Sequence, residues 1–462
     1  MEMLTVGIAV ASGACQELML LAAVGIVIGG TNDFAVDLIW IARTLWRHLF
    51  IYRQFPAANS ENLAPAAASG PVAIFIPAWD ESAVIGHMLR HAVSAWGDNN
   101  WRIYVGAYPN DPGTVAAIDG VGSPRIRIVI GDLPGPTTKA DCLNTLWARL
   151  EEDERVEGRR FKAVILHDAE DVVHPFEIRL FDRMIEHFDL VQLPVLPLID
   201  RRSRWIGGHY NDEFAEHHSK TIVVREAIGA AVPAAGVGCA FERDMLGKIA
   251  TARGGTPFDH DSLTEDYELG LRIGELGGRA AFVRLPTRRN GPVVAIRAHF
   301  PATLRAAVRQ KSRWMTGIAL AGWDRLGWSG NIAERWMRAH DRRAPLAALI
   351  LVAAYGSGVL YALVGMARML LPVRGVEISP VLQMLITVGG ALMMWRLVIR
   401  CIFVSRAYGF VEGLRSIPRA LVGNLVMMLA AVRALRLYVE MRRSGIVRWD
   451  KTDHHFPDMA AQ

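Results

Sequence analysis

Ala163-Val-Ile-Leu-His-Asp-Ala-Glu-Asp171 is a short apolar run that passes directly into three carboxylates. A brief apolar run followed by polar residues is typical of a buried strand, here residues 163–166. Three carboxylates at one strand end repel each other unless a cation lies among them. Oxygen ligands favour Mg²⁺ or Mn²⁺, so Asp168 and Glu170 are candidate metal ligands, with a pyrophosphate completing the coordination shell. A solvated acidic turn is the alternative that this motif alone leaves open.

Short strands alternate with helices around this motif. Strands are expected at 72–76, 101–107 and 125–130, and helices at 81–96 and 138–150. This alternation predicts an α/β domain with a Rossmann-like, mostly parallel sheet and helices on both faces. Ligands of such sheets lie beyond the carboxyl ends of the strands. The segments 77–81, 107–114 and 167–171 are therefore expected to surround one crevice.

Thr264-Glu265-Asp266 is a second acidic motif. Asp266 is a candidate general base, because a carboxylate within hydrogen-bond range can accept the proton of an attacking hydroxyl. The same residues also suit the start of a helix, with Thr264 as the N-cap and the acids in the first turn. The two interpretations are compatible.

Two basic motifs are candidates for phosphate binding. In Gln310-Lys-Ser-Arg-Trp314, Gln310 and Arg313 share a helix face, and Trp314 adds a flat aromatic surface. Arg313 suits a diphosphate leaving group, and a basic helix lying on lipid is the alternative. Lys139 opens the helix expected after residues 131–138, where a positive group favours phosphate. For Lys139 alone, an ordinary surface lysine is the alternative.

Apolar residues gather towards the two ends of the chain. The sequence is 52% hydrophobic and 21% charged, yet its runs at 4–30, 346–371 and 378–399 carry few charges. About 20 apolar residues cross a bilayer, so each run is long enough to span it. Residues 34–52 mix arginine with apolar side chains and are expected to be an interfacial helix. Residues 421–439, which carry Arg433 and Arg436, are expected to be an interfacial or re-entrant helix, with a fourth span as the alternative. A cleaved signal peptide is the alternative for the first run, which lacks a preceding Lys or Arg and a clear cleavage site.

These segments divide the chain into a membrane and interfacial part (1–56), a cytoplasmic domain (57–343), further membrane and interfacial helices (344–440) and a cytoplasmic tail (441–462). Arginines that follow or precede the spans set this orientation and account for the net charge of +5. No nucleic-acid-binding motif accompanies the basic excess, so no nucleic acid partner is expected. Four separated cysteines give no support for a disulfide framework or a structural zinc site.

Taken together and in this order, the motifs resemble the processive family 2 glycosyltransferases, the cellulose- and chitin-synthase-like group. The matches are Phe75-Ile-Pro-Ala-Trp-Asp-Glu81, Lys139 to Asn144 (KAxxLN), Asp168-Ala-Glu170 (DxD), Thr264-Glu-Asp266 (TED) and Gln310 to Trp314 (QxxRW). The resemblance covers residues 70–440 and implies a GT-A fold for residues 57–343. Within the group, His167 to Pro175 and Trp449 to Thr452 are similar to inner-membrane proteins of phage adsorption and exopolysaccharide export.

The resemblance implies a multi-pass protein of the bacterial inner membrane with its catalytic domain in the cytoplasm. Its expected activity is inverting transfer of a hexosyl or N-acetylhexosaminyl group from a nucleotide-sugar, expected to be a UDP-sugar, to a growing glycan for surface exopolysaccharide. Its expected partners are a glycan or lipid-linked acceptor, the lipid bilayer and an outer-membrane export protein. The alternatives are a non-processive transferase that acts on a lipid carrier and a non-catalytic scaffold or receptor.

The resemblance also implies a role for each candidate residue. The nucleotide-sugar is expected to contact Pro77, Glu81, Asp111 and Lys139, and the metal, Mg²⁺ or Mn²⁺, is expected to be held by Asp168 and Glu170. The expected base is Asp266, beside Thr264 and Glu265. The leaving diphosphate is expected to be stabilised by Arg313 with Gln310, and the acceptor sugar to stack on Trp314. The aspartate-rich turn of the group reads Gly106 to Thr114 here, with Asp111 in place, so uracil recognition is expected to differ.

Overall fold

A seven-stranded sheet forms the centre of the larger domain in a computed structural model that describes residues 2–371, 375–445 and 456–457. The strands are β1 (Val72–Pro77), β2 (Trp101–Ala107), β3 (Ile126–Ile130), β4 (Ala163–Leu166), β5 (Leu190–Gln192), β6 (Cys239–Glu242) and β7 (Ala280–Phe282), in the order β3-β2-β1-β4-β6-β5-β7. β6 runs antiparallel to β4 and β5, and the other pairs are parallel. The predicted mostly parallel sheet is confirmed. The Trp449 to Thr452 motif lies outside the described residues.

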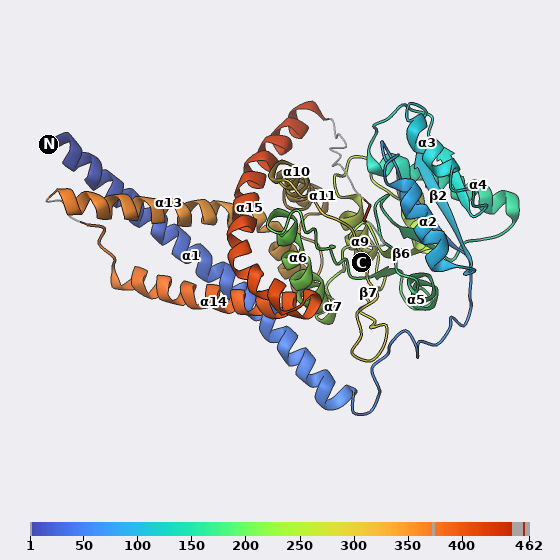
Figure 1. Cartoon of the computed structure of the whole chain (residues 1–462), viewed down its shortest axis with the longest axis horizontal. Helices are drawn as coiled ribbons and strands as arrows, with labels where there is room; N and C mark the ends of the chain where they lie inside the picture. The colour runs from blue at the N-terminus through green and yellow to red at the C-terminus, as the bar shows by residue number, and fades with distance from the viewer. Residues whose placement is uncertain (1, 372–374, 446–455, 458–462) are drawn as a thin grey trace.

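Helices cover both faces of this sheet (Figure 1). Those of the domain are α2 (Ile85–Trp96), α3 (Pro112–Asp119), α4 (Lys139–Glu157), α5 (Glu177–Met184), α6 (Ile206–Glu216), α7 (Ile222–Ala227), α8 (Arg243–Ala252), α9 (Glu265–Glu275), α10 (Leu304–Met315), α11 (Gly322–Leu326) and α12 (Ile332–Arg342). Three π-helical turns are η1 (Arg47–Ile51), η2 (His217–Thr221) and η3 (Thr316–Ala321). The helix expected at 81–96 begins at Ile85, because Asp80 has a left-handed φ of 52° and residues 80–84 form a turn.

The core of the domain has two layers separated by the sheet. All six residues of β1 are buried, as expected for a central strand covered on both faces. Ile74 and Ile76 pack on the face that α2 covers, and Phe75 packs on the face that α4 covers. This two-sided packing fixes the ends of β1 and β4, which carry the candidate site.

Among the described residues, four helices are long and apolar enough to cross a membrane: α1 (Glu2–Trp46), which continues into η1, α13 (Ala344–Leu370), α14 (Pro380–Tyr408) and α15 (Phe410–Ser444). α1 is one continuous helix, although the sequence predicted a span followed by a separate interfacial helix. Figure 1 shows α15 running across α1, α13 and α14 rather than alongside them. The interfacial course expected for residues 421–439 stays a prediction, because α15 is also long and apolar enough to span a membrane.

A layer of ion pairs joins the membrane helices to the α/β domain. Lys220 of η2 donates to Asp37 of α1 at 2.5 Å and to Glu216 of α6 at 2.7 Å. At the same level, Asp33 of α1 pairs with Arg343 at 2.5 Å and with Arg396 of α14. Glu216 also accepts from Arg400 of α14 at 3.2 Å. We call these side chains the charged layer: Asp33, Asp37, Glu216, Lys220, Arg343, Arg396 and Arg400.

Candidate active site

The end of β4 is held by a buried histidine. His167, which is fully buried, places its two ring nitrogens 2.9 Å from Asp171 and 3.1 Å from Glu177. Burial alone would lower the pKa of His167, but the charges of Glu177 and Asp171 more than offset it and raise that pKa to about 10. Asp171 also accepts a hydrogen bond from the backbone N–H of Asp168 at 3.1 Å. The imidazolium therefore fixes the turn that carries Asp168 and Glu170.

Lys139 is the cation among the candidate catalytic carboxylates. It opens α4, whose first turn is fixed by a reciprocal capping pair between Thr138 and Asp141. Its Nζ lies 2.6 Å from Asp168 Oδ1. Burial would lower the pKa of Lys139, but the negative charges of Asp168, Glu265 and Asp266 raise it well above its usual value. The lysine thus links the DxD and TED motifs in space.

Glu265 and Asp266 lie at the start of α9, where Glu265 is buried and Asp266 is half-buried. Burial, followed by the charge of Asp266, raises the pKa of Glu265 to about 7. Burial also raises the pKa of Asp266, against the opposing charge of Lys139. Gly236, with a left-handed φ of 75°, approaches so closely that a Cβ there would lie 2.5 Å from Asp266 Oδ2. The glycine-rich loop before β6 therefore packs directly on the candidate base.

Thr264 occupies the N-cap position of α9, but its side chain makes no capping hydrogen bond. The part of the N-cap prediction that assigned this role to the hydroxyl is therefore wrong. The hydroxyl is instead buried without a hydrogen-bond partner among the described residues. It faces Gly317 of η3, where an added Cβ would lie 2.6 Å from Thr264. The glycine brings the helix that follows QxxRW into contact with TED.

The QxxRW residues of α10 face the same space. Gln310, Arg313 and Trp314 all line one cavity, together with Lys139, Asp168, Glu170 and Asp266. Within the described chain, the guanidinium of Arg313 has no hydrogen-bond or ion-pair partner, and Gln310 Oε1 is buried without one. The Trp314 ring is fixed edge-on against Tyr210 and Phe300, at centroid distances of 6.2 and 6.4 Å. A half-buried cation without a counter-ion suits an anionic ligand.

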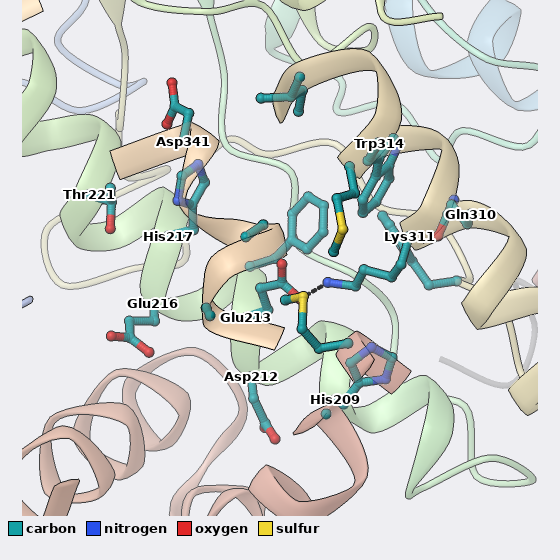
Figure 2. A pocket seen from close by; sticks show the side chains of 18 of the residues that line it. His209, Asp212, Glu213, Glu216, His217, Thr221, Gln310, Lys311, Trp314 and Asp341 are labelled. Carbon is teal, nitrogen blue, oxygen red and sulfur yellow. Dashed lines mark hydrogen bonds and ion pairs between the residues drawn. The ribbon is translucent and has the colours of Figure 1, made fainter. Parts of the chain in front are cut away.

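This cavity has a volume of about 1800 Å³ and reaches from the carboxyl end of β4 to the membrane helices. Figure 2 shows its middle part, where Glu213 of α6 points towards Lys311 of α10. Lys311 pairs there with Glu213, and the charge of the lysine offsets burial and lowers the pKa of Glu213 to about 2. His209 and His217 line the same part. One continuous space thus joins the candidate acid–base groups to the bilayer side.

Three predicted substrate-binding residues lie outside the lining of this cavity. Asp111 caps α3, with one carboxylate oxygen 3.2 Å from Thr114 N and the other 2.6 Å from Asp80 N. Glu81 is 7% exposed, and its backbone N–H donates to the hydroxyl of Thr114. Pro77 ends β1 opposite Gly106. These residues form a neighbouring corner at the ends of β1 and β2, and Asp111 has a clear structural role there.

The sequence prediction missed the wall that α6 contributes. His209 and Glu213 of α6 line the cavity with His217 of η2, and Lys311, the second residue of QxxRW, is the partner of Glu213. The available signal was the dense polar and aromatic stretch from His209 to His218, which ordinary surface helices seldom carry. No periodic pattern marks it as a binding surface.

Asp168 and Glu170 suit a divalent cation that the substrate helps to coordinate. In the described residues, no three His, Cys, Asp or Glu side chains converge as a ready-made metal site. Two carboxylates with diphosphate oxygens nevertheless give a common Mg²⁺ or Mn²⁺ arrangement. The Lys139 ammonium, 2.6 Å from Asp168, already places a positive charge at this position. The donor set therefore fits a metal held jointly by protein and nucleotide.

Comparisons with known proteins agree with this site. Residues 69–317 match the family model described as "Glycosyltransferase like family 2". The chain is 35% identical to "Bacteriophage adsorption protein B" of Escherichia coli strain K12 and to "Bacteriophage N4 adsorption protein B" of Escherichia coli O157:H7. Each alignment covers 95% of this chain and 62% of the relative, so the chain spans under two thirds of the length of these relatives.

The fold is similar to that of a mannosyltransferase from Pyrobaculum calidifontis, solved with GDP-Man and Mn²⁺. The TM-score is 0.55 at 16% sequence identity, and the match covers 90% of this chain and 99% of the other. This likeness confirms the GT-A fold that the sequence resemblance implied. The matches to the phage adsorption proteins confirm the similarity that the sequence motifs indicated.

Proposed function

Because the chain belongs to the family 2 glycosyltransferases, we propose that it transfers a sugar with inversion from a nucleotide-sugar to an acceptor hydroxyl at the membrane. The chain is a membrane glycosyltransferase, and the mechanism, donor and acceptor are the proposal. One observation carries it: Lys139 lies among Asp168, Glu265 and Asp266, in the cavity that Arg313 and Trp314 also line. Groups suited to the donor diphosphate and to the acceptor therefore face one space.

The proposed reaction is a single displacement. The acceptor hydroxyl oxygen attacks C1 of the donor sugar, and the bond from C1 to the phosphate oxygen breaks. The leaving nucleoside diphosphate takes the electron pair, and Asp266 takes the hydroxyl proton. Arg313 and Lys139 neutralise charge that develops on the diphosphate. Trp314 offers its ring to the acceptor sugar, and Gly236 lets the backbone approach the reacting groups.

A divalent metal held by Asp168 and Glu170 would supply further charge neutralisation at the diphosphate. The Pyrobaculum mannosyltransferase was solved with GDP-Man and Mn²⁺, which supports a nucleotide-sugar and a divalent metal here. A UDP-sugar is the donor that the family resemblance favours. Pro77 ends β1 and Glu81 follows four residues later, and we place the nucleoside part of the donor beside these residues.

The biological role is proposed from the relatives. The relatives are named for bacteriophage adsorption, which takes place at the cell surface, so a product displayed on that surface is consistent with the similarity. We therefore propose synthesis of a surface glycan, with the α/β domain in the cytoplasm, where nucleotide-sugars are made. An outer-membrane export partner belongs to this proposal, and so does the bacterial inner membrane as the location.

Replacement of Asp266 tests the role of the base. Asp266→Asn keeps the size of the side chain but removes the proton acceptor, so we expect the transfer rate to fall by about 10²–10⁴-fold. The assay uses inner-membrane vesicles that contain the full chain, Mn²⁺ and a mixture of labelled UDP-hexoses, UDP-N-acetylhexosamines and GDP-mannose. Sizing the labelled product separates a polymerase from an enzyme that adds one sugar.

The matched control is Asp244→Asn, an exposed acid in the first turn of α8 that has no part in the site. We expect it to transfer sugar at the wild-type rate. Mn²⁺-dependent UDP binding should survive in Asp266→Asn, because the base does not hold the nucleotide. Transfer by Asp266→Asn at the wild-type rate would refute the assignment of the base.

A further inference from the structure

The cavity continues past the charged layer into the membrane helices. Its lining there comes from α1, α13, α14 and α15 and includes Ile26, Gly29, Ile350, Leu392, Leu421 and Met427. Gly29 precedes Asp33 by four residues in α1, which places it about 6 Å deeper at the helical rise of 1.5 Å per residue. The far end of the cavity is therefore an apolar groove at membrane level, which we call the membrane groove.

Polar side chains in the membrane groove are already satisfied. Tyr355 of α13 and Asn424 of α15 line it, and Asn424 donates to the Tyr355 hydroxyl at 3.0 Å. A sugar residue here would bring several hydroxyls into surroundings with few hydrogen-bond partners, and burying unsatisfied hydroxyls is unfavourable. The groove therefore disfavours a bare glycan and admits a hydrocarbon chain.

The membrane groove is open to the side. Ile28, Met393 and Leu421 line it and are 67%, 51% and 61% exposed, respectively. Exposed apolar side chains on membrane helices face lipid. A molecule already in the bilayer can therefore enter the groove without passing through water.

A positively charged rim separates the groove from the catalytic end. Arg343 and Arg396 both pair with Asp33, so two guanidiniums share one carboxylate, and all three line the cavity. The arginine side chains are 29% and 46% exposed, which leaves donors for a further anion. Guanidinium groups bind phosphate through several charge-assisted hydrogen bonds. The rim is suited to a phosphate at the boundary between apolar and polar regions.

We propose that the acceptor is a lipid-linked sugar whose hydrocarbon chain lies in the membrane groove and whose phosphate contacts Arg343 and Arg396. Its sugar then extends past the charged layer to Trp314 and presents a hydroxyl to Asp266. The bilayer is as apolar as the groove, so the chain gains little by moving and the phosphate supplies the affinity. This inference rests on the proposed function, because it names the acceptor of the same transfer.

Glycines of α1 suggest a selective way to block the groove. A Cβ at Gly25 would lie 2.4 Å from Ile350, and one at Gly30 would lie 2.9 Å from Leu392, so both positions hold helices together. A Cβ at Gly29 meets nothing within 4 Å. Gly29→Phe therefore places a ring in the groove without forcing α1 away from its neighbours.

The test measures binding of labelled farnesyl phosphate to the full chain in phosphatidylcholine nanodiscs, with empty nanodiscs subtracted. We expect saturable binding by the wild type and at least tenfold weaker binding by Gly29→Phe and by Arg396→Gln. Gly13→Phe is the matched control, because a Cβ there also meets nothing within 4 Å and the residue does not line the cavity. It should bind like the wild type.

A second measurement follows the product in inner-membrane vesicles. Early label from the nucleotide-sugars should partition into butanol, farnesyl phosphate should slow transfer, and Gly29→Phe should lose transfer while keeping Mn²⁺-dependent UDP binding. Label that appears in a water-soluble glycan only, together with unchanged transfer by Gly29→Phe, would overturn the inference and leave the proposed function standing. Absence of transfer by the wild type would overturn the proposed function and the inference with it.

Discussion

His167 shows how one buried residue supports a reactive turn. Its imidazolium lies between Asp171 and Glu177, and Asp171 in turn holds the backbone of Asp168. Removing the central positive charge would leave two buried carboxylates without a counter-ion. Breaking a buried ion pair from one side usually costs about 3–5 kcal/mol. The histidine is a positioning residue, since its side chain acts through the turn and not on the substrate.

We predict that His167→Gln lowers the free energy of unfolding by about 3–5 kcal/mol and weakens Mn²⁺-dependent UDP binding at least tenfold, in line with losses of supporting residues around metal ligands. Thermal unfolding and equilibrium binding measure the two effects on the full chain in detergent. His260→Gln, at a side chain that is 65% exposed, serves as the control. Unfolding shifted without any change in UDP binding would show that His167 acts on stability alone.

At the residue level, sequence motifs placed the reactive groups better than their supports. Asp168, Glu170, Asp266 and Arg313 line one cavity, and each belongs to a motif that was recognisable in the sequence, while their proposed roles stay predictions. The role of Asp111 as the N-cap of α3 was not predicted. Its carboxylate accepts hydrogen bonds from the backbone N–H groups of Asp80 and Thr114. Such a contact is set by backbone geometry that side-chain chemistry does not reveal.

At the level of elements, the contact between η3 and α9 fixes the distance between the QxxRW and TED motifs. Gly317 lies against Thr264 where any side chain would collide, and the π-helical turn of η3 directly follows α10. π-helical turns are frequent at functional sites. A shift of this turn would move Arg313 and Trp314 relative to Asp266.

We predict that Gly317→Ala destabilises the protein by about 1–3 kcal/mol and lowers the transfer rate at least tenfold, because the added methyl overpacks the contact with Thr264. Alanine otherwise favours a helix over glycine by about 0.5–1 kcal/mol, so the sign of the change separates collision from propensity. Gly390→Ala in α14, where a Cβ meets nothing within 4 Å, is the control and should be neutral or slightly stabilising. A stabilised, fully active Gly317→Ala would disprove the contact.

Elements with a regular pattern of apolar residues were predictable from the sequence, and helices that bury polar residues were not. The strands β1, β2 and β4 follow from short apolar runs, and α4 follows from Thr138 at its cap. α6 was missed because its buried residues include charged and polar groups such as Asp212, whose partner Arg419 lies far along the chain. The sequence analysis divided α1 into two helices near Asn32 and Asp33, because polar residues seldom lie within a membrane helix. In the structure both residues are paired, Asn32 with His340 and Asp33 with Arg343.

Across the whole molecule, buried charges join the α/β domain to the membrane helices. Arg419 of α15 is 2% exposed, donates to Asp212 of α6 at 2.7 Å and pairs with Glu412 at 2.8 Å. Burial raises the pKa of Asp212 to about 7, while the charge of Arg419 opposes the rise. A carboxyl whose pKa is raised in the folded state binds its proton more tightly there, so stability falls as pH increases towards that pKa.

We predict that Arg419→Met destabilises the protein by about 3–5 kcal/mol at pH 8 and by less at pH 5.5. Without Arg419 the pKa of Asp212 rises further, so more stability is lost as pH increases through this range. Adding Asp212→Asn should restore part of the loss at pH 8, because it removes the unpaired charge. Thermal unfolding across the pH range measures the effect. Arg415→Met, at a 38% exposed partner of Glu412, should change little, and equal losses in both variants would contradict the assignment.

The ion pair between Asp33 and Arg396 also sets an order of events during synthesis. The two residues are separated by 363 positions, and Arg343 emerges from the ribosome between them. At synthesis rates of about 5–20 residues per second, Asp33 is made roughly 20–70 s before Arg396. During most of that interval Asp33 lacks both of the guanidinium groups that pair with it in the folded protein. The charged layer is therefore completed only after α14 has been made, although its first carboxylates belong to α1.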